Sequence, residues 1–229
     1  MKITYIHHSG FLVETENRYL LFDYYKGKLP EFNPEKPLYV FASHVHHDHF
    51  DSKVFQAGTD GQRRRYILSS DIPCRSIPMG CRPYAVRIKP HENWNDGSVF
   101  VETLASTDQG VAFWVVTDGK AVYHAGDLND WYWDGDDEDK KQEQDYLQEM
   151  QRMKGRHADV AFVPVDPRLG RNAILGLDYF TRYVDASVIF PMHCWEKYQV
   201  IGAIKKMPQS EPYRSRIMGI SYDGETYIL

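Results

Sequence analysis

The chain has 229 residues, of which 42% are hydrophobic, 14% aromatic and 26% charged, as in a folded protein rather than a disordered one, and we expect one domain over residues 1–229. The net charge of −5 argues against nucleic acid or an anionic membrane as a partner, and no run approaches the roughly 18 apolar residues of a membrane span. Three cysteines that cannot all pair, and a start without the apolar core of a signal peptide, favour the reducing cytoplasm.

The first half of the chain reads as short strands separated by turns. Asp118-Gly119 lies between two apolar stretches in 111–126, which predicts a tight hairpin, and Asp223-Gly224 gives a second such signal in 220–229. β-rich apolar runs bounded by turn residues predict the remaining strands of this half: residues 3–15, 18–25, 38–44, 64–70, 84–92 and 98–106.

The second half of the chain contains the predicted helices. Residues 136–156 are acidic at the start and basic at the end, which suits the helix dipole. Residues 195–208 predict a second helix, which Pro208 ends. Many strands with mostly late helices indicate an α+β layered fold. A weaker helix and two β-rich runs complete this half: 177–184, 159–165 and 186–193.

The stretch FASHVHHDHFD, residues 41–51, places four histidines and an aspartate within six positions. Side chains alternate along an extended segment, so His44 and His46 point the same way, and after a turn Asp48 and His49 can point to a neighbouring spot. One short segment thus offers two clusters of ligands, which is what a pair of metal ions needs. The alternative is a solvent-exposed polar loop, for which so many ligand-type residues together would be an improbable coincidence.

Further ligand-type residues follow in a fixed order along the chain. The segments are TYIHHSGFLVETENRYLLFDYY, SHVHHDHFD, YHAGDLND and PMHCW. With these segments the chain resembles the metallo-β-lactamase superfamily over nearly its whole length, and specifically its stand-alone hydrolases of the L-ascorbate-6-phosphate lactonase kind. The resemblance implies an α+β fold, the four-layer αβ/βα sandwich, with a two-metal site along one edge.

The resemblance also implies which residues act at this site. Three side chains are expected around the ligands: Asp23 and His124 behind them, and His8, which either lines the site or is a buried histidine with its own partners. The implied ligands are His44 and His46 for the first ion, Asp48, His49 and His193 for the second, and Asp127 as the bridge between the two.

One position departs from the family pattern. The family usually supplies a third histidine to the first site from the end of a strand, and the corresponding stretch here, LASTDQGVAF, has none. We infer that Asp108 replaces it; the alternatives are that His91 reaches in, or that the first site is weak or empty. A carboxylate there tilts the preference from zinc toward manganese or iron. The expected cofactors are two divalent metal ions, zinc or manganese, with iron as a further choice.

The predicted reaction is metal-assisted hydrolysis. Two divalent ions roughly 3.5–4 Å apart can share a water and lower its pKa toward neutrality, which gives a bridging hydroxide. Asp48 would ligate a metal and also orient the hydroxide or accept its proton. We therefore expect a hydrolase of a small ester, lactone or phosphodiester. The alternatives are a non-catalytic or mononuclear member with a degenerate first site, and a redox member. The oligomeric state stays open.

Two segments beside the ligands bear on the substrate, which we expect to be a small molecule. Trp131, Tyr132 and Trp133 follow Asp127 and either form the rim of a pocket or pack under the adjacent helix. Arg168 follows a predicted strand and either reaches an anionic group or makes a surface salt bridge.

Overall fold

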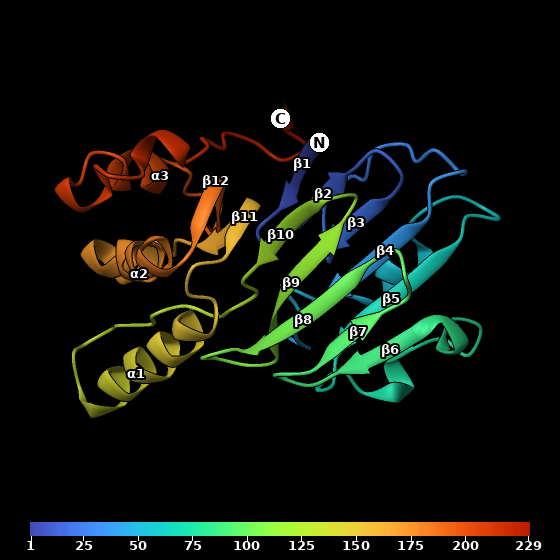
Figure 1. The fold of residues 1–229 in the computed structure, drawn as a ribbon, viewed down its shortest axis with the longest axis horizontal. Helices are drawn as coiled ribbons and strands as arrows, with labels where there is room; N and C mark the ends of the chain where they lie inside the picture. Colours follow the sequence, from blue (N-terminus) through green and yellow to red (C-terminus); the bar gives the residue numbers. More distant parts are fainter.

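The fold, described for residues 1–229 by a computed structural model, consists of two β-sheets packed face to face with helices beside one of them (Figure 1). The first sheet has seven strands in the spatial order β13 (Thr226–Ile228), β1 (Lys2–His7), β2 (Gly10–Glu14), β3 (Tyr19–Phe22), β4 (Leu38–Ala42), β5 (Arg64–Ser69) and β6 (Ala85–Ile88). The second has six, in the order β12 (Asp185–Met192), β11 (His157–Pro164), β10 (Lys120–His124), β9 (Val111–Thr117), β8 (Phe100–Ala105) and β7 (Asn93–Asn95). The α+β sandwich class is confirmed.

Both sheets are mixed. Strands β3 to β6 pair in parallel, as do β10, β11 and β12, and the other neighbours are antiparallel. Strand β4, LYVFA, is buried at every position, as expected for a parallel strand covered on both faces. The main core lies between the sheets and continues under the helices, where Tyr123 of β10 stacks on Phe180 at 5.0 Å.

The helices lie together on one side of the molecule, beside β11 and β12 (Figure 1). They are α1 (Asp137–Arg152), α2 (Leu175–Tyr183) and α3 (Gln199–Ile204), and none is long and apolar enough to cross a membrane. The helices predicted at 136–156 and 177–184 are confirmed. The one predicted at 195–208 begins later, because Trp195 and Glu196 have φ angles of 50° and 59°, which a right-handed helix does not allow.

The outer face of the first sheet carries short 3₁₀ turns in place of α-helices. These are η1 (Ser52–Gln56), η2 (Cys74–Ser76) and η3 (Arg82–Tyr84). Pro73, Pro78 and Pro83 punctuate this segment, and proline cannot continue a helix because it lacks the N–H and clashes with the preceding turn. Val54 and Phe55 of η1 nevertheless close a second apolar cluster over this face.

Two predicted strand features differ from the structure. The run 3–15 is not one extended segment: it turns at His8-Ser9, where His8 has φ 56°, and β1 pairs antiparallel with β2. The Asp118-Gly119 hairpin between β9 and β10 is confirmed. The Asp223-Gly224 turn does not make a hairpin, because the strand after it pairs with β1.

Two glycines allow the backbone to approach Ser43 closely. Gly110 has φ 77°, and a Cβ there would overlap the carbonyl oxygen of Ser43 and lie 2.6 Å from the Cβ of His44. Gly126 has φ 53°, and a Cβ there would lie 2.6 Å from the Cβ of Ser43. Glycine alone tolerates both the angle and the approach, so these positions set the spacing between β4, the β8–β9 turn and the end of β10.

We therefore predict that Gly110→Ala lowers the free energy of unfolding by about 2–4 kcal/mol, from overpacking and from the left-handed backbone. The matched control is Gly202→Ala in α3, where nothing lies within 4 Å of the added Cβ. It should leave stability unchanged or raise it by about 1 kcal/mol. Urea unfolding followed by circular dichroism measures both, and equal effects at the two positions would contradict the prediction.

Candidate metal centre

The predicted ligands gather where strands of both sheets end. His44 and His49 follow β4, Asp127 follows β10 and His193 follows β12, while Asp108 lies in the turn between β8 and β9. The structure thus brings together side chains that lie far apart in the sequence.

The ligand-type side chains form two groups of four, and each group could hold one metal ion. Within each group one ligand atom per residue lies within 4.8 Å of the others. The first group is His44, His46, Asp108 and Asp127, and the second is His8, Asp48, His49 and His193. In the first group His44 and Asp127 are buried, while the side chains of His46 and Asp108 are 43% and 49% exposed, so this group opens to solvent.

Asp108 lies at the position where the sequence lacks a histidine. Its Oδ2 is 3.7 Å from Nδ1 of His46. The alternative residue, His91, lies elsewhere: its Nε2 is 2.8 Å from Oε1 of Glu149. Burial, with Asp127 next to it, raises the pKa of the Asp108 carboxyl above its ordinary value. A cation at this position would relieve the repulsion between the two carboxylates.

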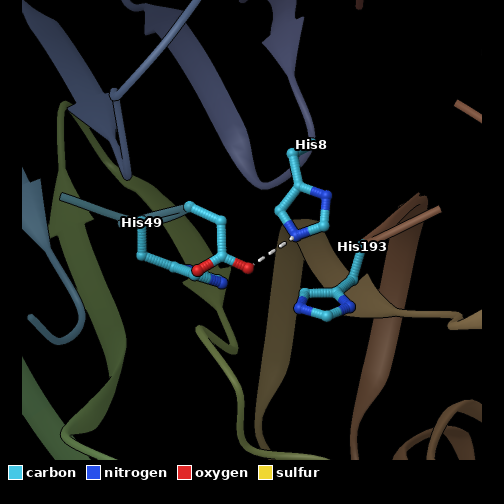
Figure 2. A group of neighbouring side chains, drawn as sticks. His8, His49 and His193 are labelled. Carbon is cyan, nitrogen blue, oxygen red and sulfur yellow. Dashed lines mark ion pairs between the residues drawn. The ribbon is translucent and has the colours of Figure 1, made fainter. Parts of the chain in front are cut away.

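His8 lies among the second group of ligands instead of behind them. Figure 2 shows its ring beside those of His49 and His193, and the dashed line marks the ion pair of its Nε2 with Oδ2 of Asp48 at 3.5 Å. The centroids of the His8 and His193 rings are 4.2 Å apart. The tight turn after β1 makes this placement possible, because it leaves His8 at the sheet edge with its side chain 2% exposed.

The two groups meet at Asp127. Its Oδ1 lies 3.1 Å from Nε2 of His49 and 3.5 Å from Nε2 of His193, and its Oδ2 lies 3.5 Å from Nε2 of His44. Asp127 therefore lies between the two groups, and it is the residue that the resemblance implies as the bridge.

Several of these atoms are buried and make no hydrogen bond with the protein, although His49 Nε2 and Asp127 Oδ1 form an ion pair at 3.1 Å. The buried atoms are Nε2 of His8, His44 and His49, and Oδ1 of Asp127. An unsatisfied buried polar atom costs about 1–3 kcal/mol, so a convergent set of them needs a compensating partner. Imidazole nitrogens and carboxylate oxygens are ligands that zinc, manganese and iron accept. The residues present therefore fit divalent metal ions.

Asp23 and Ser43 orient two of the histidines from behind, and both are fully buried. Asp23 Oδ2 is 2.7 Å from Nδ1 of His49, and the same carboxylate accepts from the backbone N–H and the hydroxyl of Ser43 at 2.8 and 2.6 Å. Ser43 Oγ lies 3.0 Å from Nδ1 of His44. With Nδ1 donating in each ring, both Nε2 atoms keep a free lone pair for a metal ion.

Asp166 orients His193 in the same way. It is fully buried at the end of β11, and its Oδ2 is 2.9 Å from Nδ1 of His193. Sequence reasoning missed this residue. The signal for it in the sequence is that Asp166 ends a predicted apolar strand, as Asp23 does.

His124 connects the two turns that carry His8 and Asp127. Its Nε2 donates to the carbonyl oxygen of Ser9 at 2.8 Å, and its Nδ1 accepts from the N–H of Gly126 at 3.1 Å. Its ring stacks on Phe22 at 4.9 Å. Because both nitrogens are occupied, His124 lies behind the ligands, as predicted, and burial lowers its pKa.

The protonation states of His8 and His44 suit metal binding, whereas Asp127 and Asp23 outweigh burial and raise the pKa of His49 well above its ordinary value. Burial lowers the pKa of His8 and of His44 to about 4, so both rings are neutral at pH 7 and offer a lone pair. Burial alone would raise the pKa of Asp127, but His49 and His193 outweigh it and hold the value well below its ordinary range. Asp127 is therefore a carboxylate at every physiological pH.

A cavity of about 460 Å³ opens onto the two groups. Trp131 is buried beneath it and donates from Nε1 to the carbonyl oxygen of Asp127 at 3.0 Å, whereas Trp133 is 45% exposed at its rim. Of the two alternatives for this aromatic segment, the rim of a pocket describes Trp133, and Trp131 lines the same cavity from below. Trp195, Gln142 and Arg168 also line the cavity, and of these three the sequence pointed only to Arg168.

Comparisons with known proteins identify the family of the chain. The family described as "Beta-lactamase superfamily domain" matches residues 2–193. The UPF0173 metal-dependent hydrolase of Alkaliphilus metalliredigens is 25% identical over 234 residues, which cover 92% of this chain and 91% of that protein.

Solved structures share the fold. Igni18, a metallo hydrolase from Ignicoccus hospitalis, has a TM-score of 0.66 at 17% identity, covering 99% of this chain and 97% of that one. CmlA, a diiron β-hydroxylase from Streptomyces venezuelae, has a TM-score of 0.53 at 12% identity, covering 97% of this chain but 47% of that one. The family match extends over most of the sequence and includes every predicted ligand, so the chain belongs to the metallo-β-lactamase superfamily.

Proposed function

We propose that this metal-dependent hydrolase cleaves a small ester, lactone or phosphodiester between the two groups of ligands. The observation that carries the proposal is the convergence of His44, His49 and His193 on Asp127, with buried Nε2 atoms of His8, His44 and His49 that make no hydrogen bond. The cavity of about 460 Å³ has the size of a small-molecule site.

The two groups would each hold one ion, with Asp127 between them. When bound, divalent ions supply Lewis acidity and bring the pKa of a nearby water toward neutrality. The chain supplies the positions: Asp23 and Asp166 each hold a histidine ring from behind, so the ligand nitrogens need not reorganise when substrate enters.

Asp48 is the residue that we assign to proton transfer. Its side chain is 13% exposed and lines the cavity. Although burial raises its pKa, His8 and His49 outweigh that effect and hold the value well below its ordinary range. An ionised carboxylate at this place can orient an attacking water and accept its proton. Trp131 and Trp133 add apolar surface to the same cavity.

Zinc and manganese are the metals that we propose first, with iron as the third. Asp108 and Asp127 give the first group two carboxylates and two imidazoles, a harder set than histidines alone. A diiron hydroxylase shares the fold, so an oxygen-handling reaction is the outcome to expect if the protein is isolated with iron.

Metal content tests the first group. Wild-type protein prepared without chelator should contain two metal equivalents by mass spectrometry, and Asp108→Ala should contain one, because the second group does not use Asp108. Asp137→Ala, on the exposed start of α1, is the matched control and should keep two. One equivalent in all three proteins would favour a mononuclear or non-catalytic member.

The orienting role of Asp23 gives a further prediction. Asp23→Asn keeps the size of the side chain but removes the charge that holds His49, so metal affinity should fall by about 10–100-fold. Competition with a chelating dye measures this affinity. Asp145→Asn, on the exposed face of α1, should have no effect. An unchanged affinity in Asp23→Asn would mean that the carboxylate serves folding only.

Turnover tests the reaction itself. Metal-loaded protein should hydrolyse at least one class among 4-nitrophenyl esters, γ-lactones and bis(4-nitrophenyl) phosphate, and His46→Ala should lower kcat by about 100-fold or more. Circular dichroism checks that the variant is folded. Full metal occupancy with no turnover on any of the three classes would leave the protein as a non-catalytic metal binder.

A further inference from the structure

Arg168 reaches the cavity from the segment after β11, and a buried carboxylate holds it there. Its Nε lies 3.0 and 2.9 Å from the two oxygens of Asp166, and its Nη2 lies 2.6 Å from Oδ2. The Asp166 side chain is fully buried, whereas that of Arg168 is 47% exposed. One edge of the guanidinium is thus occupied by Asp166, while Nη1 has no hydrogen bond with the protein.

Two tryptophans hold the same guanidinium. Its Cζ lies 4.7 Å from the ring centroid of Trp195 and 5.6 Å from that of Trp133. Trp195 is itself fixed, because its Nε1 donates to Oδ2 of Asp166 at 3.0 Å. Trp133 and Trp195 are 45% and 36% exposed, so both keep surface in contact with solvent or with a ligand. Cation–π contacts of this kind restrict the guanidinium to one orientation.

Asp166 links this arrangement to the metal centre. The carboxylate oxygen that bonds Arg168 and Trp195 is also the one that lies 2.9 Å from Nδ1 of His193. Asp48 and Asp127, after Asp166, help to raise the pKa of Arg168, which shows that the guanidinium lies within electrostatic reach of the ligands. A surface salt bridge needs neither a buried partner nor two flanking aromatic rings. The alternative that Arg168 only makes a surface salt bridge therefore does not account for its surroundings.

We propose that Arg168, held by Asp166 between Trp133 and Trp195, is an anion-binding subsite for the substrate. The substrate would then carry a carboxylate or phosphate group in the same small molecule as the bond that is cleaved. A guanidinium with free N–H groups binds such oxyanions in a defined geometry, which the point charge of a lysine does not provide. This inference rests on the proposed function, since it names the substrate class of the same site.

A matched pair of esters tests the subsite. Mono-4-nitrophenyl adipate carries a free carboxylate, and 4-nitrophenyl hexanoate has the same acyl length without it. In Arg168→Gln, KM for the adipate ester should rise about tenfold or more relative to KM for the hexanoate ester. Arg168→Lys should recover little of this. Arg171→Gln, an exposed arginine in the same segment that does not line the cavity, should keep the wild-type ratio. A ratio that is the same in Arg168→Gln and wild type would overturn the subsite.

A binding measurement separates this inference from the hydrolase proposal. Adipate and inorganic phosphate are titrated separately against tryptophan fluorescence, to which Trp133 and Trp195 contribute along with the other three tryptophans, and which needs no turnover. A saturable change in wild type and Arg171→Gln that is absent in Arg168→Gln would support the subsite even if neither ester is hydrolysed, and the tighter of the two anions would distinguish carboxylate from phosphate.

Metal content measured on the same samples distinguishes a loss of the guanidinium's own contact with the anion from a loss of the metal centre. Two equivalents in Arg168→Gln, as in wild type, would assign the loss of anion binding to the guanidinium. A loss of metal would show that Arg168 acts by holding Asp166 against His193, and the anion-binding role would be overturned.

Discussion

The buried carboxylate of Asp23 fixes two histidines from one short loop, and the rest of the metal centre is arranged around that contact. It bonds His49 directly and Ser43 twice, and Ser43 in turn contacts His44. One carboxylate therefore orients a histidine from each of the two groups. Gly110 and Gly126 then bring the opposite turns against Ser43, so that Asp127 can reach both rings.

Backbone strain is concentrated at the same strand ends. His8, Asp23 and His193 have φ angles of 56°, 43° and 63°, a region that side chains other than glycine rarely adopt. Each such residue costs on the order of 1–3 kcal/mol and persists only where the surroundings enforce it. Here the surroundings are the apolar core between the two sheets, which keeps the strands in register up to their last residue. The packing between the two sheets thus stabilises strained backbone at the strand ends, where the ligand-type residues lie.

The sequence was most informative where a single short segment contains all the residues of a predicted cluster. His44, His46, Asp48 and His49 could be assigned from local spacing, and the strands around them from their apolar runs. The position of His8 was not predictable in this way, because the chain reverses direction at His8-Ser9, inside a segment that reads as one β-rich run over residues 3–15. The hydrogen-bond partners of Asp166 were not predictable either, because a contact between the ends of β11 and β12 depends on how these parallel strands align in space.

The second group of ligands joins residues that are made at very different times. A ribosome adds about 5–20 residues per second, so His8, Asp48 and His49 exist without His193 for on the order of ten seconds. Strands β11 and β12 must also pair before His193 meets the others, and pairing between distant strands is slow. The complete second group can therefore form only after His193 has been synthesised and β12 has paired with β11.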